Sequence, residues 1–211
     1  MATIGLSKPY YALYSASGTT VTYSDPGFLG KATELSVEVE SADDNNLWAD
    51  NGIAESDNQF AGGSLSITVD DLLQDAIKAV LGVQTQTITS EGITTANPEW
   101  LVYNESQVIP YVGFGGIIKK KVNGAIKYVA LVLPKVQFKN PNDDVTTQED
   151  EIEWQTQTLE GTIMRDDTAT KGWRYVSSLM DSEADALAAI QLILGAPQQA
   201  AADPATTVTG N

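Results

Sequence analysis

The sequence predicts a mainly β fold with a flanking helix, and three stretches carry the prediction. Residues 149–164, EDEIEWQTQTLEGTIM, alternate between a polar face and a more apolar one. Residues 33–40, TELSVEVE, alternate in the same way, with aliphatic side chains on one face and glutamates on the other. Between residues 111 and 133, two strand-like runs flank Asn123-Gly124, a dipeptide typical of a two-residue hairpin turn. Period-two alternation indicates strands with one packed face and one solvated face.

Further elements follow in chain order. A hairpin is expected to join Tyr10–Ala16 to Thr19–Tyr23, and residues 63–70 predict a strand. A flanking helix is predicted over 71–81, capped by Asp70 or Asp71 and ended by Gly82. A short C-terminal helix is predicted after Asp181 or Ser182, up to Gly195. Residues 1–195 are therefore expected to form one domain, whereas the polar tail 196–211 has too few large apolar residues to fold.

Residues 41–62 are rich in Asn, Asp and Gly, which predicts a long loop. Leu47, Trp48 and Phe60 are large apolar residues within this polar segment. Long loops in compact domains are usually functional, so we expect these side chains to dock on a surface. That surface is either the chain's own domain or a second subunit.

The composition excludes several classes of chemistry. The chain has no cysteine and no histidine, which excludes disulfides, thiol nucleophiles and histidine-dependent acid–base catalysis. The sequence shows no nucleophile with a partner base. We therefore expect that the protein is not an enzyme and that it binds no metal and no cofactor. The remaining enzymatic alternative is a pair of carboxylates of the kind that glycosidases use. A net charge of −16 argues against binding nucleic acid through phosphate neutralisation.

The charges are segregated along the chain. Every charged residue from 32 to 77 is acidic, and every charged residue from 119 to 142 is a lysine. The uniformly acidic strand faces fit either an ordinary solvated surface or a wall that a polyanion must not adhere to. No run reaches the roughly 18 apolar residues of a membrane span, and no secretion signal is apparent at the N-terminus, so we expect synthesis and retention in a cytoplasm.

Three stretches resemble the major tail proteins of long-tailed, non-contractile bacteriophages. They are LWADNGIAESDNQFAGGSLSITVDDL, YVGFGG and KYVALVLPKVQFKNPNDDVTTQEDEIEWQTQTLEGTI, and the resemblance spans roughly residues 5–180. It implies a β-sandwich or half-barrel of tail-tube type that assembles into hexameric rings. The rings would stack into a tube around a tape-measure protein, and DNA would pass through without specific binding. The implied location is the virion tail, with tail terminator and distal tail proteins as further partners.

This resemblance assigns roles to the acidic faces and the charged segments. Channel-facing residues are expected among Glu34, Glu38, Glu40, Glu149, Glu151, Glu153, Gln155 and Gln157. Inter-subunit contacts are expected from Leu47, Trp48, Phe60, Lys119, Lys121 and Lys127. The alternatives are the tube protein of a contractile injection system and a carbohydrate- or receptor-binding β-sandwich.

Overall fold

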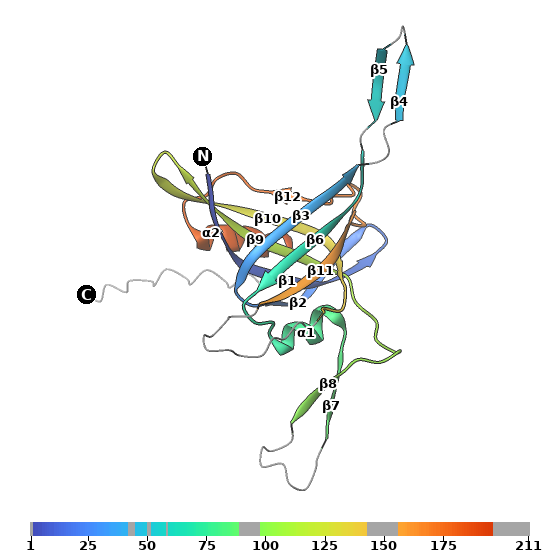
Figure 1. The fold of residues 1–211 in the computed structure, drawn as a ribbon, viewed down its shortest axis with the longest axis vertical. Helices are drawn as coiled ribbons and strands as arrows, with labels where there is room; N and C mark the ends of the chain where they lie inside the picture. The colour runs from blue at the N-terminus through green and yellow to red at the C-terminus, as the bar shows by residue number, and fades with distance from the viewer. Residues whose placement is uncertain are drawn as a thin grey trace, which may run out of the picture.

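The fold is built on one large antiparallel sheet, as seen in a computed structural model that describes residues 2–41, 45–49, 52–57, 59–88, 98–142 and 156–195. The strand order is β2-β1-β9-β10-β11-β6-β3, and β12 pairs with β10 outside this path (Figure 1). The strands are β1 (Ala2–Ser17), β2 (Thr20–Phe28), β3 (Ala32–Ser41), β6 (Phe60–Val69), β9 (Val112–Val122), β10 (Ala125–Phe138), β11 (Gln157–Met164) and β12 (Tyr175–Val176). The predicted mainly β fold is confirmed.

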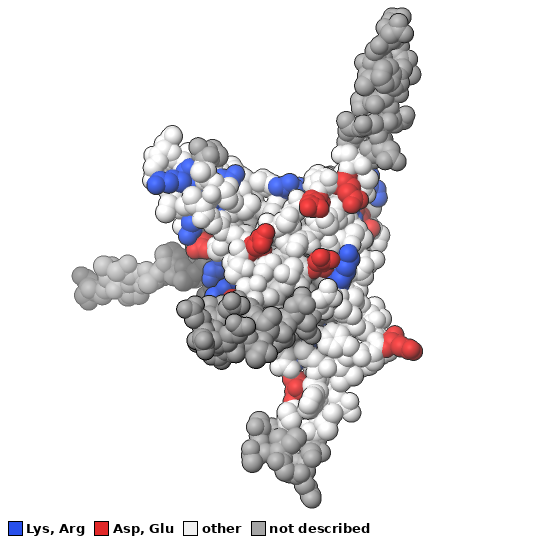
Figure 2. Space-filling model, in the orientation of Figure 1, with Lys and Arg blue, Asp and Glu red and all other residues white. Residues whose placement is uncertain are grey.

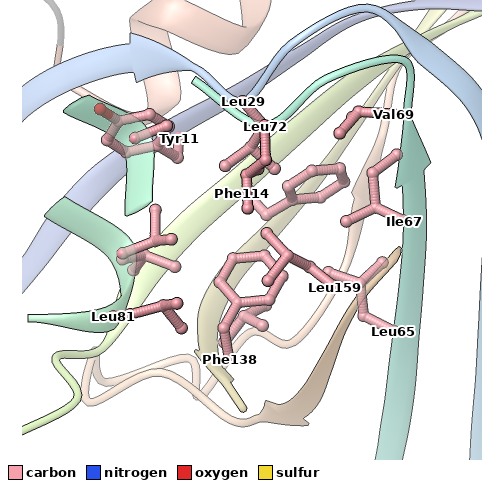
Figure 3. Close-up of a cluster of buried hydrophobic side chains, with 14 of the residues drawn as sticks. Tyr11, Leu29, Leu65, Ile67, Val69, Leu72, Leu81, Phe114, Phe138 and Leu159 are labelled. Carbon is pink, nitrogen blue, oxygen red and sulfur yellow. The ribbon is translucent and has the colours of Figure 1, made fainter. Parts of the chain in front are cut away.

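The sheet curls so that its two halves share one core. Leu65 and Ile67 of β6 are fully buried and belong to the same cluster as Phe114 of β9 and Phe138 of β10. The two phenylalanine rings pack edge to face with their centroids 6.4 Å apart (Figure 3). Because side chains alternate across each strand, the opposite face of β3, β6 and β11 is left outside this core.

The helix α1 (Gln74–Leu81) covers one end of the core (Figure 1). Its buried residues Ala76, Val80 and Leu81 join the cluster between the sheet halves. It ends as predicted, with Gly82 in the left-handed conformation. The predicted cap is wrong, because the helix begins after Leu73 and no side chain caps it. The Asp70 carboxylate instead accepts hydrogen bonds from the backbone N–H groups of Lys31 and Asp71.

The helix α2 (Glu183–Ile193) packs on the outer face of β1, β9 and β10 and forms a second core cluster. It begins as predicted, with the Ser182 hydroxyl accepting a hydrogen bond from the Asp185 N–H at 3.0 Å. A Cβ atom on Gly115 would lie 2.4 Å from Ile190 Cγ2. The absence of a side chain at Gly115 therefore allows the helix to approach the sheet closely.

Two small hairpins extend from the body in opposite directions (Figure 1). One is β4 (Asn45–Ala49) with β5 (Gly52–Asp57), and the other is β7 (Gln84–Thr87) with β8 (Glu99–Val102). The prediction of a loop over 41–62 is therefore wrong, since half of its residues form β4 and β5, and Phe60 begins β6. The Asn/Asp/Gly composition that resembled a loop belongs in part to a short two-stranded ribbon.

The remaining predictions have mixed outcomes. The β1–β2 and β9–β10 hairpins are confirmed, and Asn123 and Gly124 have φ of 49° and 84°, as the tight turn requires. Strand β12, which pairs with β10, is two residues long. The first part of the strand predicted at 149–164 and the tail 196–211 lie outside the described residues. Within the described ranges, neither helix has the length and apolar character needed to cross a membrane.

Candidate functional site

Strands β3, β6 and β11 present one continuous polar face away from the core. The sheet register places Glu34 of β3 beside Thr68 of β6, and Thr68 beside Thr158 of β11. The two threonine hydroxyls lie 2.9 Å apart, within hydrogen-bonding distance. The next two rows repeat the arrangement with Ser36, Ser66 and Glu160, and with Glu38, Ser64 and Thr162. The face therefore consists of glutamates set among small hydroxyl side chains.

This face is open and negatively charged. Glu34, Glu38 and Glu40 are all exposed along β3, and Figure 2 shows acidic side chains spread over β3, β6 and β11. The nearby cation Lys139 lies 3.9 Å from Glu160, which partly offsets its charge. A shallow hollow of about 210 Å³ runs between these two residues and Glu38. The surface lacks the apolar enclosure of a small-molecule pocket and is suited to repelling an anion along its length.

The predicted second acidic strand contributes less to this face than expected. Gln157 is described, at the start of β11, and its side-chain oxygen accepts a hydrogen bond from the Leu72 N–H at 3.1 Å. It therefore anchors the segment before α1. Glu149, Glu151, Glu153 and Gln155 lie outside the described residues. Sequence reasoning missed Glu160 because it lies on the opposite side of the strand from Gln157. In β11, Thr158, Glu160 and Thr162 are exposed, whereas Leu159 and Ile163, which alternate with them, are buried. The side of the strand that was predicted to be polar through Gln157 is therefore the side that faces the core along β11.

Strand β3 is one of the two terminal strands of the main sheet, and β2 is the other. Strand β3 pairs with β6 along one side, and no described strand pairs with its other side. This leaves an edge ten residues long, from Ala32 to Ser41. Backbone N–H and C=O groups along an open edge are a template for pairing with another chain. The acidic face and the open edge thus meet on the same strand.

The predicted interface lysines lie around the β9–β10 turn. Lys121 is exposed, whereas Lys119 is half-buried with its ammonium 5.7 Å from the centre of the Tyr128 ring. Lys127 forms an ion pair with Asp181, just before α2, and so serves at least one contact inside the subunit. Figure 2 shows basic side chains gathered toward this turn, away from the acidic face.

Phe60 makes its principal described contact within the subunit. Its ring stacks on Trp173, with centroids 4.2 Å apart and planes 6° from parallel. Leu47 and Trp48 lie on β4, where Trp48 pairs with Ile53 of β5; the side chains of this ribbon are outside the described part of the structure. The described contact of Phe60 is therefore with a residue of its own subunit.

Sequence reasoning missed a basic cavity beside this aromatic pair. Arg165, Lys171 and Arg174, together with Phe60 and Trp173, line an open surface depression of about 460 Å³, which we call the basic cavity. One signal was available, because Arg165 and Arg174 are the two arginines of the whole chain and lie within ten residues of each other. The cavity lies where β6 begins and β11 has just ended.

No protein-family model matches this chain, and neither does any curated protein.

Proposed function

We propose that this chain is a structural virion protein, the tail-tube subunit of a long-tailed, non-contractile phage. Copies close into hexameric rings, and the rings stack into a tube with an acidic channel for DNA. The tape-measure protein occupies the channel during assembly, and the tail terminator and distal tail proteins bind the tube ends. The sequence resemblance to major tail proteins gives the starting point for this proposal.

The observation that carries the proposal is the pairing of an open edge with an acidic face on β3. A ten-residue edge left exposed on an isolated domain invites uncontrolled association. Closure of several copies into a ring removes that edge, as closure does in any β-barrel. In such a ring, the face carrying Glu34 and Glu38 would line the bore.

An acidic lining is the physically favourable one for a DNA duct. Each lysine or arginine that neutralises a phosphate strengthens DNA binding, and several such contacts would hold the DNA in place. Glutamates repel phosphates within roughly one Debye length, about 8 Å at physiological salt, so they act close to the wall. Serine and threonine between them add polarity without positive charge, and Glu160 offsets the nearby Lys139.

The direct test is electron microscopy of the purified protein in negative stain over a range of concentrations. Six-fold rings or tubes are the expected result. A stable monomer at every concentration, above all one that binds a carbohydrate, would overturn the proposal in favour of a binding module. A contractile injection system would give similar rings, and assembly with a sheath protein would identify it.

A further inference from the structure

The basic cavity next to β6 gathers three exposed cations on a strongly acidic chain. Arg165, Lys171 and Arg174 are exposed, and none of them forms an ion pair with a described carboxylate. Arg165 donates to the Phe60 carbonyl oxygen, and its guanidinium carbon lies 5.8 Å from the centre of the Phe60 ring. Three cations beside two stacked aromatic rings form a surface that fits a carboxylate next to an aliphatic side chain.

The opposite end of the same strand presents such a group. Strand β6 runs from Phe60 at the cavity to Val69, which is directly followed by the segment leading into α1. Ten residues of strand span about 33 Å, so the two features lie at opposite ends of the body. Asp71 is exposed and Leu73 is 50 % exposed. The Asp75 carboxylate lies 3.4 Å from the Lys78 ammonium on the same helix, but its side chain is 94 % exposed and so remains accessible to a second cation.

We propose that the cavity formed by Arg165, Lys171 and Arg174 receives the Asp71–Asp75 segment of a second copy. The two carboxylates would meet the cations, and Leu73 would lie against the rings of Phe60 and Trp173. This inference rests on the proposed tube and deepens it, because it assigns the contact between successive rings. The partner is a second copy because the complementary acid–leucine–acid surface is on this chain itself.

The placement of the two surfaces determines what the contact builds. A contact between different surfaces at opposite ends is heterologous, so each copy keeps one free surface of each kind and the stack continues. Exposed ion pairs contribute little individually but orient the partners. When two rings stack, every subunit makes this contact at the same time. Several weak contacts of this kind together hold the two rings stably.

Charge reversal in the cavity provides the test. Lys171→Glu with Arg174→Glu leaves Arg165 and its hydrogen bond to Phe60 in place. We expect this variant to form rings that do not stack, or to need at least about tenfold more protein to form tubes. The matched control, Lys171→Arg with Arg174→Lys, keeps the charge and should form tubes normally. Asp71→Lys with Asp75→Lys should fail in the same way, and all four charge reversals in one chain should restore tubes.

The outcomes separate this inference from the proposed function. If the wild type forms no rings, the proposed function fails. If the wild type and the Lys171→Glu, Arg174→Glu variant form tubes at the same protein concentration, the function stands and this inference is overturned. The inference would also be overturned if the Lys171→Glu, Arg174→Glu variant stacked normally but unfolded at a lower temperature, because the cavity would then serve contacts within one subunit. Each double charge reversal is expected to abolish tubes by itself. If it does, and the variant with all four charge reversals still forms no tubes, the Asp71–Asp75 segment is excluded as the partner of the cavity.

Discussion

Lys135 and Asp167 form an ion pair with 2.7 Å between Nζ and Oδ2, which joins β10 to the segment that follows β11. The Tyr14 hydroxyl donates to the same carboxylate oxygen at 2.7 Å, and the Lys135 ammonium lies 4.8 Å from the centre of the Tyr111 ring. Burial and the hydrogen bond to Asp167 raise the pKa of Tyr14 to about 12, so it remains a donor. This cluster fixes the segment that carries Arg165 and Arg174.

The ion pair predicts a specific dependence of stability on pH. Hydrogen bonds from Lys135 and then Tyr14 lower the pKa of Asp167 below its ordinary value. The resulting stabilisation is fully present above the unfolded-state pKa, about 3.9, and is lost as the pH falls through the lower folded-state pKa. Asp167→Asn should therefore reduce the acid-induced loss of stability, measured by urea unfolding between about pH 6 and pH 2. Lys135→Met should have the same effect, and an unchanged pH profile in both variants would contradict the assignment.

The stacked pair of Phe60 and Trp173 predicts a stability role inside the subunit. Phe60→Ala should lower the free energy of unfolding of the unassembled subunit by about 2 kcal/mol, because a half-buried ring and its stacking contact are lost. Phe60→Leu keeps much of the apolar volume and should lose about 1 kcal/mol. Chemical denaturation measures both. A Phe60→Ala subunit that is as stable as the wild type but does not assemble would instead place Phe60 at a subunit interface.

The close approach of α2 to β9 predicts sensitivity at Gly115. Gly115→Ala should cost about 1–3 kcal/mol, because the new Cβ would meet Ile190 Cγ2 at 2.4 Å. Gly116→Ala is the matched control, since the nearest atom to its new Cβ is Leu6 Cδ1 at 3.7 Å. Combining Gly115→Ala with Ile190→Ala should cost less than the sum of the two single changes. Additive costs would show that the helix does not limit the space at this position.

The acidic face predicts an effect on DNA passage. Glu34→Lys with Glu38→Lys should leave tubes intact but slow DNA ejection from assembled phage, because the lining would then attract phosphates. Glu34→Gln with Glu38→Gln removes the repulsion without adding attraction and should have a smaller effect. Time-resolved fluorescence of a DNA-binding dye reports ejection. Equal ejection rates in all three proteins would show that this face lies away from the DNA.

The segregation of charge predicts salt-dependent assembly. The lysines near the β9–β10 turn are expected to meet an acidic surface of a neighbouring subunit, so raising the salt from about 50 mM to about 500 mM should weaken ring formation. Lys119→Glu with Lys121→Glu should impair it at all salt concentrations, whereas arginine at both positions should preserve it. Light scattering and electron microscopy measure assembly. Assembly that is indifferent to salt would contradict this interface.

The features predicted correctly depend on neighbours along the chain. The alternation in β3, the Asn123-Gly124 turn and the Ser182 cap are local patterns, and each is found where the sequence places it. The wrong assignments were decided by distant partners. Asp70 was expected to cap α1, but the Lys31 N–H on a neighbouring segment is its partner. The loop predicted over 41–62 instead forms the β4–β5 ribbon and the start of β6.

The sequence by itself determined that this is an acidic β protein with alternating strands, without cysteine or histidine chemistry, and with its charges grouped in blocks. Only the tertiary structure decided that β3 is a terminal strand, that Glu160 joins the face of Glu34 and Glu38, and that both arginines surround the Phe60–Trp173 stack. The physical reason is that strand order and sheet curvature minimise the free energy of the whole core. Residues more than a hundred positions apart become neighbours through that packing, and no local pattern specifies them.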